Sequence, residues 1–271
     1  MNIYQDQVSQ ARTALERYRT TLVKFAKLQH SPILEIDRKE IIKYLEHGGF
    51  PDRPDTIPLL MKCLIKSCYS YAVLRKYCVS ILGEIPSPGT IGECLARVFS
   101  HEPFREEETW FPAKLGETAA EIQVREKYDL KSNRMKPRMI RVLLDSSSEM
   151  GMKLERGLSA FYLEVEDVVK GEPEHLWEYV VELARGIYNV GPALICDFLK
   201  EIGFSQFVKV DHHFQKEFPA LMNMNSCDKI SPRIHFIISQ QISKELGMTP
   251  YHLDKILYDW GRYKKYANWV E

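Results

Sequence analysis

The run Asp211-His212-His213 contains the side chains of this sequence that are best suited to chemistry. A carboxylate can stabilise a developing positive charge or take a proton from water, and an imidazole can exchange protons near neutral pH. Adjacent histidines on a helix point about 100° apart, so they are a poor pair of ligands for one ion, and we expect no metal here. Asp211 also has a simpler interpretation, because Asp commonly caps a helix such as the one expected from His212.

The segment before Asp211 predicts two helices joined by a short turn. Its first helix places Leu176, Val180 and Leu183 on one face. Pro192 favours the first position of the second helix, and Gly203 suits its end. Residues 175–203 are therefore a predicted helix-hairpin-helix unit. Its turn would present backbone N–H groups at the start of the second helix, where the dipole favours an anion such as a phosphate.

This stretch resembles the helix-hairpin-helix (HhH-GPD) DNA glycosylase superfamily, which has a Gly/Pro-rich turn followed by an aspartate. In the family pattern an aliphatic-Asp pair comes about twenty residues after the last turn glycine, and here Val210-Asp211 follows Gly191 at that spacing. The resemblance implies that Asp211 is the catalytic aspartate. His213 matches a histidine often found two positions after that aspartate.

The sequence also departs from the family pattern. Asn189 replaces the first turn glycine, although Asn tolerates left-handed backbone better than other non-glycine residues. Ala193 stands where bifunctional members carry a lysine, and the four-cysteine cluster of some members is missing after Asp211. The resemblance therefore implies a monofunctional enzyme without Schiff-base chemistry, without an iron–sulfur cluster and without another cofactor.

The resemblance further implies which groups contact DNA. The turn at Asn189, Val190, Gly191 and Ala193 would hold a phosphate, and His213 would lie near the DNA. Backbone carbonyls of Arg185, Ile187 and Val190 would be candidates for a monovalent cation. The implied partner is double-stranded DNA with one nucleotide flipped out of the stack, bound by a monomer.

Two activities follow as alternatives from this pattern. The first is hydrolysis of the N-glycosidic bond of a damaged or modified base, in DNA repair or against modified foreign DNA. The second is a non-catalytic helix-hairpin-helix DNA-binding protein. A helical scaffold that never touches DNA is a third interpretation, because short glycine turns between helices are frequent.

A basic stretch offers a second contact with DNA. Residues 131–141 hold five basic side chains and no acid. Such a stretch could follow the DNA backbone and make affinity sensitive to salt, or it could be a solvated surface loop. Of these five basic residues, the candidate DNA contacts are Lys131, Arg134, Lys136 and Arg138.

Composition excludes several protein classes. The chain has 271 residues, 45% hydrophobic, with 37 basic and 37 acidic side chains and zero formal net charge. It is neither a disordered chain nor a polycation, so binding of nucleic acid requires a local basic face. The six cysteines form no CxxC pair and are expected to be reduced. We expect no membrane span, no signal peptide and a cytoplasmic location, associated with the nucleoid in a prokaryote.

Hydrophobic periodicity predicts an all-α protein of two helical subdomains with a cleft between them. Residues 1–50 are expected to pack with the C-terminal helices of 211–271, and 51–210 to form the bundle that carries the hairpin, with an irregular insertion at 98–150. Helices are predicted over 11–28, from a capping box at Asp37 and Glu40, and after Ser231 and Thr249. The last of these helices is expected to end at Gly261.

Overall fold

The computed structural model describes residues 3–31, 33–68, 146, 149–187, 190–224 and 230–269. Every regular element in these ranges is a helix and none is a strand, which confirms the all-α class. Among these helices, none combines the length and the hydropathy that a membrane span needs. The predicted insertion at 98–150 lies almost entirely outside the described ranges.

The chain divides into two compact units. The terminal unit consists of Met1–Asp52 and Gly203–Glu271, and the central unit consists of Arg53–Ile202. Asp211 belongs to the terminal unit, whereas the turn before Pro192 belongs to the central unit. We describe each unit by itself.

The N-terminal helix is longer than predicted. α1 spans Ile3–Lys27, and its apolar face is fully buried at Leu15, Leu22 and Phe25. After a short loop come α2 (Glu35–Glu40) and η1 (Ile41–Glu46), a π-helical stretch that follows α2 directly.

The two C-terminal helices begin where the sequence predicts. α13 spans Pro232–Leu246, and the Ser231 hydroxyl accepts a hydrogen bond of 3.3 Å from the Ile234 N–H. α14 spans Pro250–Tyr263, and Thr249 caps it in the same way. Both starts follow from local chemistry, because a hydroxyl at the N-cap satisfies a backbone N–H that has no partner within the helix.

The ends of these two helices differ in how well the sequence predicts them. Gly247 ends α13 with φ 71°, a left-handed conformation that glycine adopts without strain. The predicted end of α14 at Gly261 is wrong, because the helix runs to Tyr263 and continues as the 3₁₀ helix η3, Lys264–Trp269.

The predicted capping box at Asp37 is also wrong. α2 begins at Glu35, and its N-cap position is occupied by Leu34, three residues before Asp37 and without a side-chain hydrogen bond. The Asp37 carboxylate is buried instead, where its Oδ2 lies 3.0 Å from the guanidinium of Arg262 and accepts a hydrogen bond from the Tyr263 hydroxyl. A contact with α14 therefore replaces the expected local cap.

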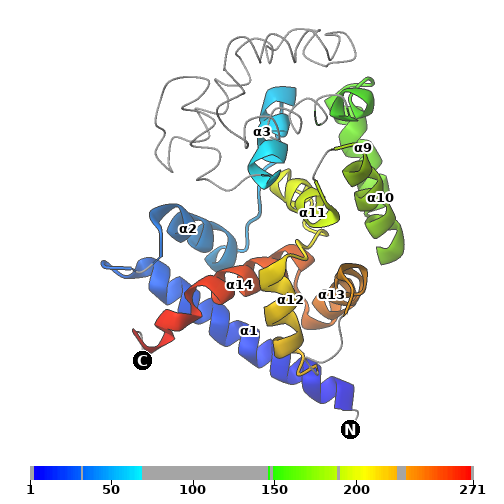
Figure 1. The fold of residues 1–271 in the computed structure, drawn as a ribbon. Coiled ribbons are helices and arrows are strands. Elements are labelled where there is room, and N and C mark those ends of the chain that lie inside the picture. Colours follow the sequence, from blue (N-terminus) through cyan, green and yellow to red (C-terminus); the bar gives the residue numbers. More distant parts are fainter. Residues whose placement is uncertain are drawn as a thin grey trace, which may run out of the picture. The chain divides into compact units, whose positions relative to one another are not determined.

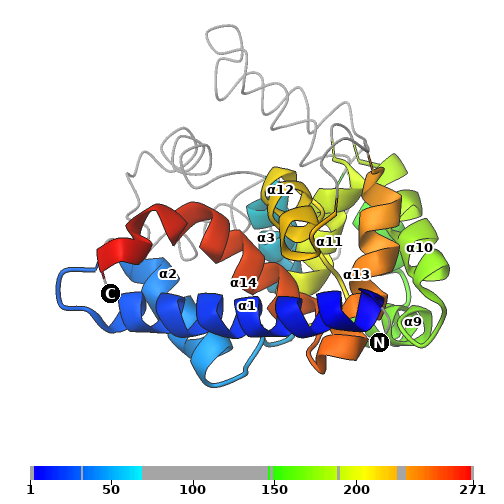
Figure 2. The same ribbon diagram turned by 90° about the horizontal axis from the view of Figure 1, so that it is seen from below.

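α14 is the central helix of the terminal unit (Figures 1 and 2). It contacts α1, α13, η1 and α12, which spans His212–Leu221. Trp260 stacks on Tyr18 of α1 with 4.1 Å between ring centroids and 9° between planes. On α12, Phe214 and Phe218 are buried. On α14 itself, eight of the 14 residues are buried, and they are spread over most of its circumference.

The central unit carries the predicted helix pair. Its described helices are α3 (Ile57–Cys68), α9 (Leu158–Val168), α10 (Pro173–Arg185) and α11 (Pro192–Glu201). α11 packs against both α3 and α10. The predicted apolar face of α10, with Leu176, Val180 and Leu183, is buried. So are Ile195, Phe198 and Leu199 of α11.

Candidate functional site

Asp211 is the N-cap of α12. Its Oδ1 accepts hydrogen bonds from the backbone N–H groups of His213 at 2.9 Å and Phe214 at 3.1 Å. These are two of the N–H groups that the first turn of a helix leaves without a partner. The capping interpretation of Asp211 is therefore confirmed, and one oxygen of the carboxylate has a structural role.

The other carboxylate oxygen of Asp211 has different surroundings. Within the part of the chain that the structure describes, Oδ2 makes no hydrogen bond or ion pair. The side chain is half-buried, so it is accessible to solvent. A fixed carboxylate with one oxygen held and the other unoccupied can still meet a cationic centre or a water molecule.

His213 lies against α14, whereas His212 is exposed. The His213 ring meets the Tyr258 ring edge-on, with 5.4 Å between centroids and 82° between planes. Gly261 makes room for it, because a Cβ there would be only 3.2 Å from the His213 Nδ1. Among the described residues, no group of three or more His, Cys, Asp or Glu side chains could hold a metal ion.

The start of α12 is fixed from both sides of Asp211. Before it, the Lys209 N–H donates to the buried carboxylate of Asp254 on α14 at 3.1 Å. After it, the Glu217 carboxylate is buried and accepts a hydrogen bond of 2.6 Å from the Lys264 ammonium. Contacts with α14 and η3 therefore hold the backbone that carries Asp211.

A buried charged cluster, which the sequence analysis missed, lies on another face of α14. The Lys255 ammonium donates a hydrogen bond of 2.8 Å to Glu40 and lies 3.3 Å from the carboxylate of Asp259. Neither Asp259 oxygen has a hydrogen bond among the described residues, and the side chain is fully buried. The only signal in the sequence was the i,i+4 pair of Lys255 and Asp259, a spacing that exposed helices share.

The protonation of this cluster follows from its burial. Burial raises the pKa of Asp259 to about 6, against the opposing effect of the Lys255 charge. Burial acts to lower the pKa of Lys255, but the carboxylates of Asp259 and Glu40 together hold it well above its ordinary value. The cluster is thus a source of pH-dependent stability rather than a reactive site, because the side chains of Lys255 and Asp259 are buried.

The turn of the central unit offers backbone groups rather than side chains. Ile187 and Val190 are buried, and Tyr188 and Asn189 lie outside the described residues. The Val190 N–H donates to the Ile187 carbonyl at 3.2 Å, so it is used within the turn. The Gly191 carbonyl is the first acceptor of α11, which leaves the N–H groups of Gly191 and Ala193 without a partner in the helix.

An acidic side chain lies beside this turn. A methyl group on Gly186, the residue that follows α10, would come within 1.9 Å of the Glu149 Oε2. The pKa of Glu149 is raised above its ordinary value. Burial is the largest cause, and the charge of Glu182 adds to it, while the charge of Lys153 opposes both. A carboxylate at this position would repel an anion bound at the turn.

The remaining predicted contacts with DNA are not described by the structure. Lys131, Arg134, Lys136 and Arg138 all lie outside the described residues. Arg185, a predicted cation ligand through its carbonyl, is the exposed last residue of α10.

No protein-family model, no curated protein and no solved structure matches this chain.

Proposed function

We propose that the protein is a DNA N-glycosylase that removes a damaged or modified base by hydrolysis. One observation carries the proposal: Asp211 begins α12 with one carboxylate oxygen fixed by two backbone N–H groups and the other unoccupied among the described residues. The Val210-Asp211 pair that supplies it follows the Gly191-Pro192 turn at the spacing of the helix-hairpin-helix glycosylases.

Asp211 would act on the sugar of a flipped nucleotide. Cleavage of a glycosidic bond passes through a transition state that resembles an oxocarbenium ion, which a nearby carboxylate stabilises. The same carboxylate can accept a proton from the water that adds to C1′, while the departing base takes the electron pair of the broken C–N bond. Such assistance is worth about 10²–10⁴-fold in rate.

The turn before Pro192 would hold the DNA backbone. The N–H groups of Gly191 and Ala193 have no partner within α11, and the helix dipole also favours a phosphate at this end. A methyl group on Gly191 would meet no atom of the described residues beyond its chain neighbours within 4 Å, which leaves room for a ligand on that side. Contacts of this kind orient the duplex and read no base.

Hydrolysis rather than strand cleavage is the proposed chemistry. Ala193 carries no amine at the position where bifunctional relatives of the motif place a lysine. A Schiff base with the abasic sugar therefore lacks its usual nucleophile. Borohydride added to a reaction in progress is expected to trap no covalent complex between protein and DNA.

A specific observation favours the second candidate, a DNA-binding protein without catalysis. Capping of α12 by itself accounts for an aspartate at position 211. Both candidates predict binding of a duplex that contains an abasic-site analogue. Only the enzyme releases a base.

The experiment that separates them uses a panel of duplex oligonucleotides, each with one damaged or modified base, followed by alkaline scission at abasic sites. We expect one or more substrates to be cut after incubation with the protein and none with Asp211→Asn, while binding of the abasic-site analogue survives. Excision that persists in Asp211→Asn contradicts the catalytic role. Binding by both proteins without any excision supports the second candidate.

A further inference from the structure

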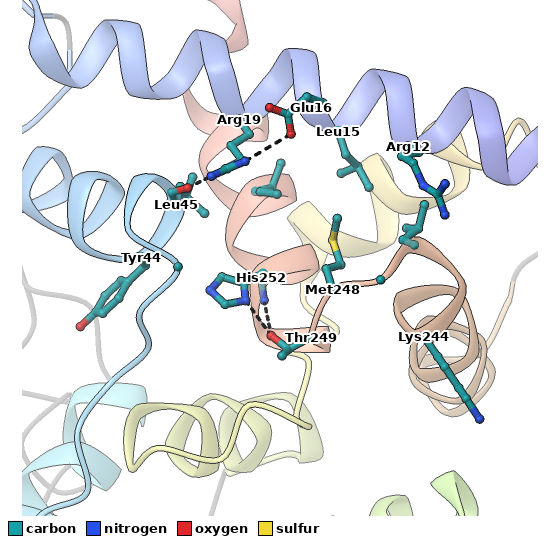
Figure 3. A pocket seen from close by; sticks show the side chains of 14 residues that line it. Arg12, Leu15, Glu16, Arg19, Tyr44, Leu45, Lys244, Met248, Thr249 and His252 are labelled. Carbon is teal, nitrogen blue, oxygen red and sulfur yellow. Dashed lines mark hydrogen bonds and ion pairs between the residues drawn. The ribbon is translucent and has the colours of Figure 1, made fainter.

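The terminal unit contains a pocket of about 770 Å³ that the proposed function does not use. It lies between α1, η1 and the turn that joins α13 to α14. Figure 3 shows Leu15 and Arg19 of α1 on one side of it and His252 of α14 on the opposite side. Its volume falls in the range of about 300–1,000 Å³ that is usual for small-molecule sites.

The pocket combines apolar side chains with basic ones. Leu15, Leu45 and Ile256 line it and are buried, so they give it an apolar floor. Its charged lining consists of the basic residues Arg12, Arg19 and Lys244 and a single acid, Glu16.

The two guanidinium groups are held in place with donors to spare. Arg12 donates through Nη2 to the Glu245 carbonyl at 2.8 Å, and Arg19 donates through Nε to the Leu45 carbonyl at 2.6 Å. The Arg19 Nη1 also lies 3.3 Å from the Glu16 carboxylate, which is mostly exposed. The other guanidinium N–H groups and the Lys244 ammonium have no partner among the described residues, so they are available to a ligand.

His252 contributes no charge to this lining. Its Nε2–H donates to the Gly49 carbonyl at 3.0 Å, and its Nδ1 accepts from the Thr249 hydroxyl at 2.8 Å. Burial lowers the pKa of His252, the hydrogen bond to Gly49 opposes this, and the charge of Arg19 lowers the pKa further. The ring is therefore neutral near pH 7, and three cations face one carboxylate.

The pocket is separate from Asp211. His252 and Ile256 line the pocket and are one turn apart on α14, whereas Tyr258 and Gly261 meet His213 of α12. At about 100° per residue, Gly261 lies about half a turn and Tyr258 about a third of a turn around the helix from His252. The two sites therefore use opposite faces of α14.

We propose that this pocket binds a small amphiphilic anion, in which an apolar body carries a carboxylate, sulfonate or phosphate group. The body would lie on Leu15, Leu45 and Ile256, and the anionic group would accept hydrogen bonds from Arg12 and Lys244. Hydrogen bonds from charged donors are stronger to an anion than to a neutral acceptor, so they would select an anion over a neutral molecule of the same shape.

The test uses the full-length protein and the fluorescent anion 8-anilinonaphthalene-1-sulfonate. We expect saturable binding of one molecule, weakened about tenfold in Arg12→Gln and in Lys244→Gln. The matched control is Lys216→Gln, which removes an exposed cation from α12 and is expected to bind like the natural protein. Met248→Trp fills the pocket without changing its charge and is expected to abolish binding.

Competition identifies the chemistry of the ligand. Octanoate is expected to displace the probe, and octanol at the same concentration is not. Equal displacement by octanol, or unchanged binding in both charge variants, overturns the proposal. Displacement of the fluorescent probe by an undamaged DNA duplex also overturns the proposal, because it would assign Arg12, Arg19 and Lys244 to binding of the DNA backbone. If Arg12→Gln fails to fold by circular dichroism, Lys244→Gln and Met248→Trp still decide the outcome. The Lys244 side chain is exposed, and its substitution leaves the backbone hydrogen bond at its carbonyl in place.

Discussion

The carboxylate of Asp211 and the backbone N–H of His213 are joined by a hydrogen bond of 2.9 Å, which makes Asp211 part of the helix that it begins. Only Oδ1 takes part in this cap, which also includes the N–H of Phe214. A structural role for one oxygen and a chemical role for the other can therefore coexist in one side chain. The substitution Asp211→Asn distinguishes the structural role from the chemical one, because the amide oxygen of Asn caps a helix about as well as Asp but carries no charge.

Replacement of Asp211 by Asn and by Ala is expected to separate stability from activity. Asp211→Ala loses the cap, so the free energy of unfolding should fall by about 1 kcal/mol, whereas Asp211→Asn should stay within a few tenths. Excision should fall about 10²–10⁴-fold in both variants. Guanidinium titration followed by circular dichroism measures the first quantity. An equal loss of stability in Asn and Ala would mean that the fold needs the charge itself.

The contact between His213 and Gly261 is expected to appear as an energetic coupling. Gly261→Ala should gain about 0.8–1 kcal/mol of helix propensity, but its new methyl group would crowd the His213 ring at 3.2 Å. We expect this gain only in a His213→Ala background, with a coupling of at least about 0.5 kcal/mol between the two changes. The four proteins of this double-mutant cycle are compared by guanidinium titration. If the changes in the free energy of unfolding are additive, there is no energetic coupling between residues 213 and 261.

The sequence predicted those features that depend on neighbouring residues. The all-α class and the starts of α13 and α14 follow from helical periodicity and from hydroxyls that cap the next turn, at Ser231 and Thr249. Asp211 was correctly expected to be able to cap α12 for the same reason. Each of these interactions spans only a few residues of the chain, so the pattern of types is enough to show it.

The sequence failed where a side chain is held by residues far along the chain. Asp37 has the pattern of a capping box, but its carboxylate is bound by Arg262 and Tyr263 of α14. Gly261 suits a helix end, but it lies inside α14, where the His213 ring approaches so closely that a Cβ would be 3.2 Å from its Nδ1. The pair of Lys255 and Asp259 has the spacing of an exposed ion pair, and only the fold reveals that it is buried.

Glu149 provides a test of where phosphate binds. If the turn before Pro192 holds the DNA backbone, the carboxylate beside Gly186 repels it. Glu149→Gln should then raise the affinity for duplex DNA a few-fold at low salt, with a difference that shrinks as salt is added. Fluorescence anisotropy with a labelled duplex measures this effect. Glu174→Gln, at the other end of α10, is the matched control, and an equal effect of both variants would move the phosphate site away from the turn.

The buried Asp259 makes stability depend on pH in a defined direction. Burial raises its pKa to about 6, whereas the ordinary value is 3.8. Between these values the folded protein keeps a proton that the unfolded chain has lost, so protonation favours the folded state. This contribution is fully present below about pH 4 and is lost as the pH rises through about 6.

Asp259→Asn should remove this dependence, because an amide in the same place stays neutral at every pH. Near pH 4 the variant and the natural protein should differ little, since both side chains are uncharged there. Between pH 4 and pH 7 the variant should gain up to about 3 kcal/mol relative to the natural protein, because only the natural protein then has a charged side chain at the buried position 259. Guanidinium titrations at pH 4, 5, 6 and 7 give this difference, in which groups common to both proteins cancel. The exposed Asp6→Asn serves as control and should show a flat difference. A variant that loses stability relative to the natural protein as the pH rises would show that the ion pair with Lys255 outweighs the cost of burying the carboxylate.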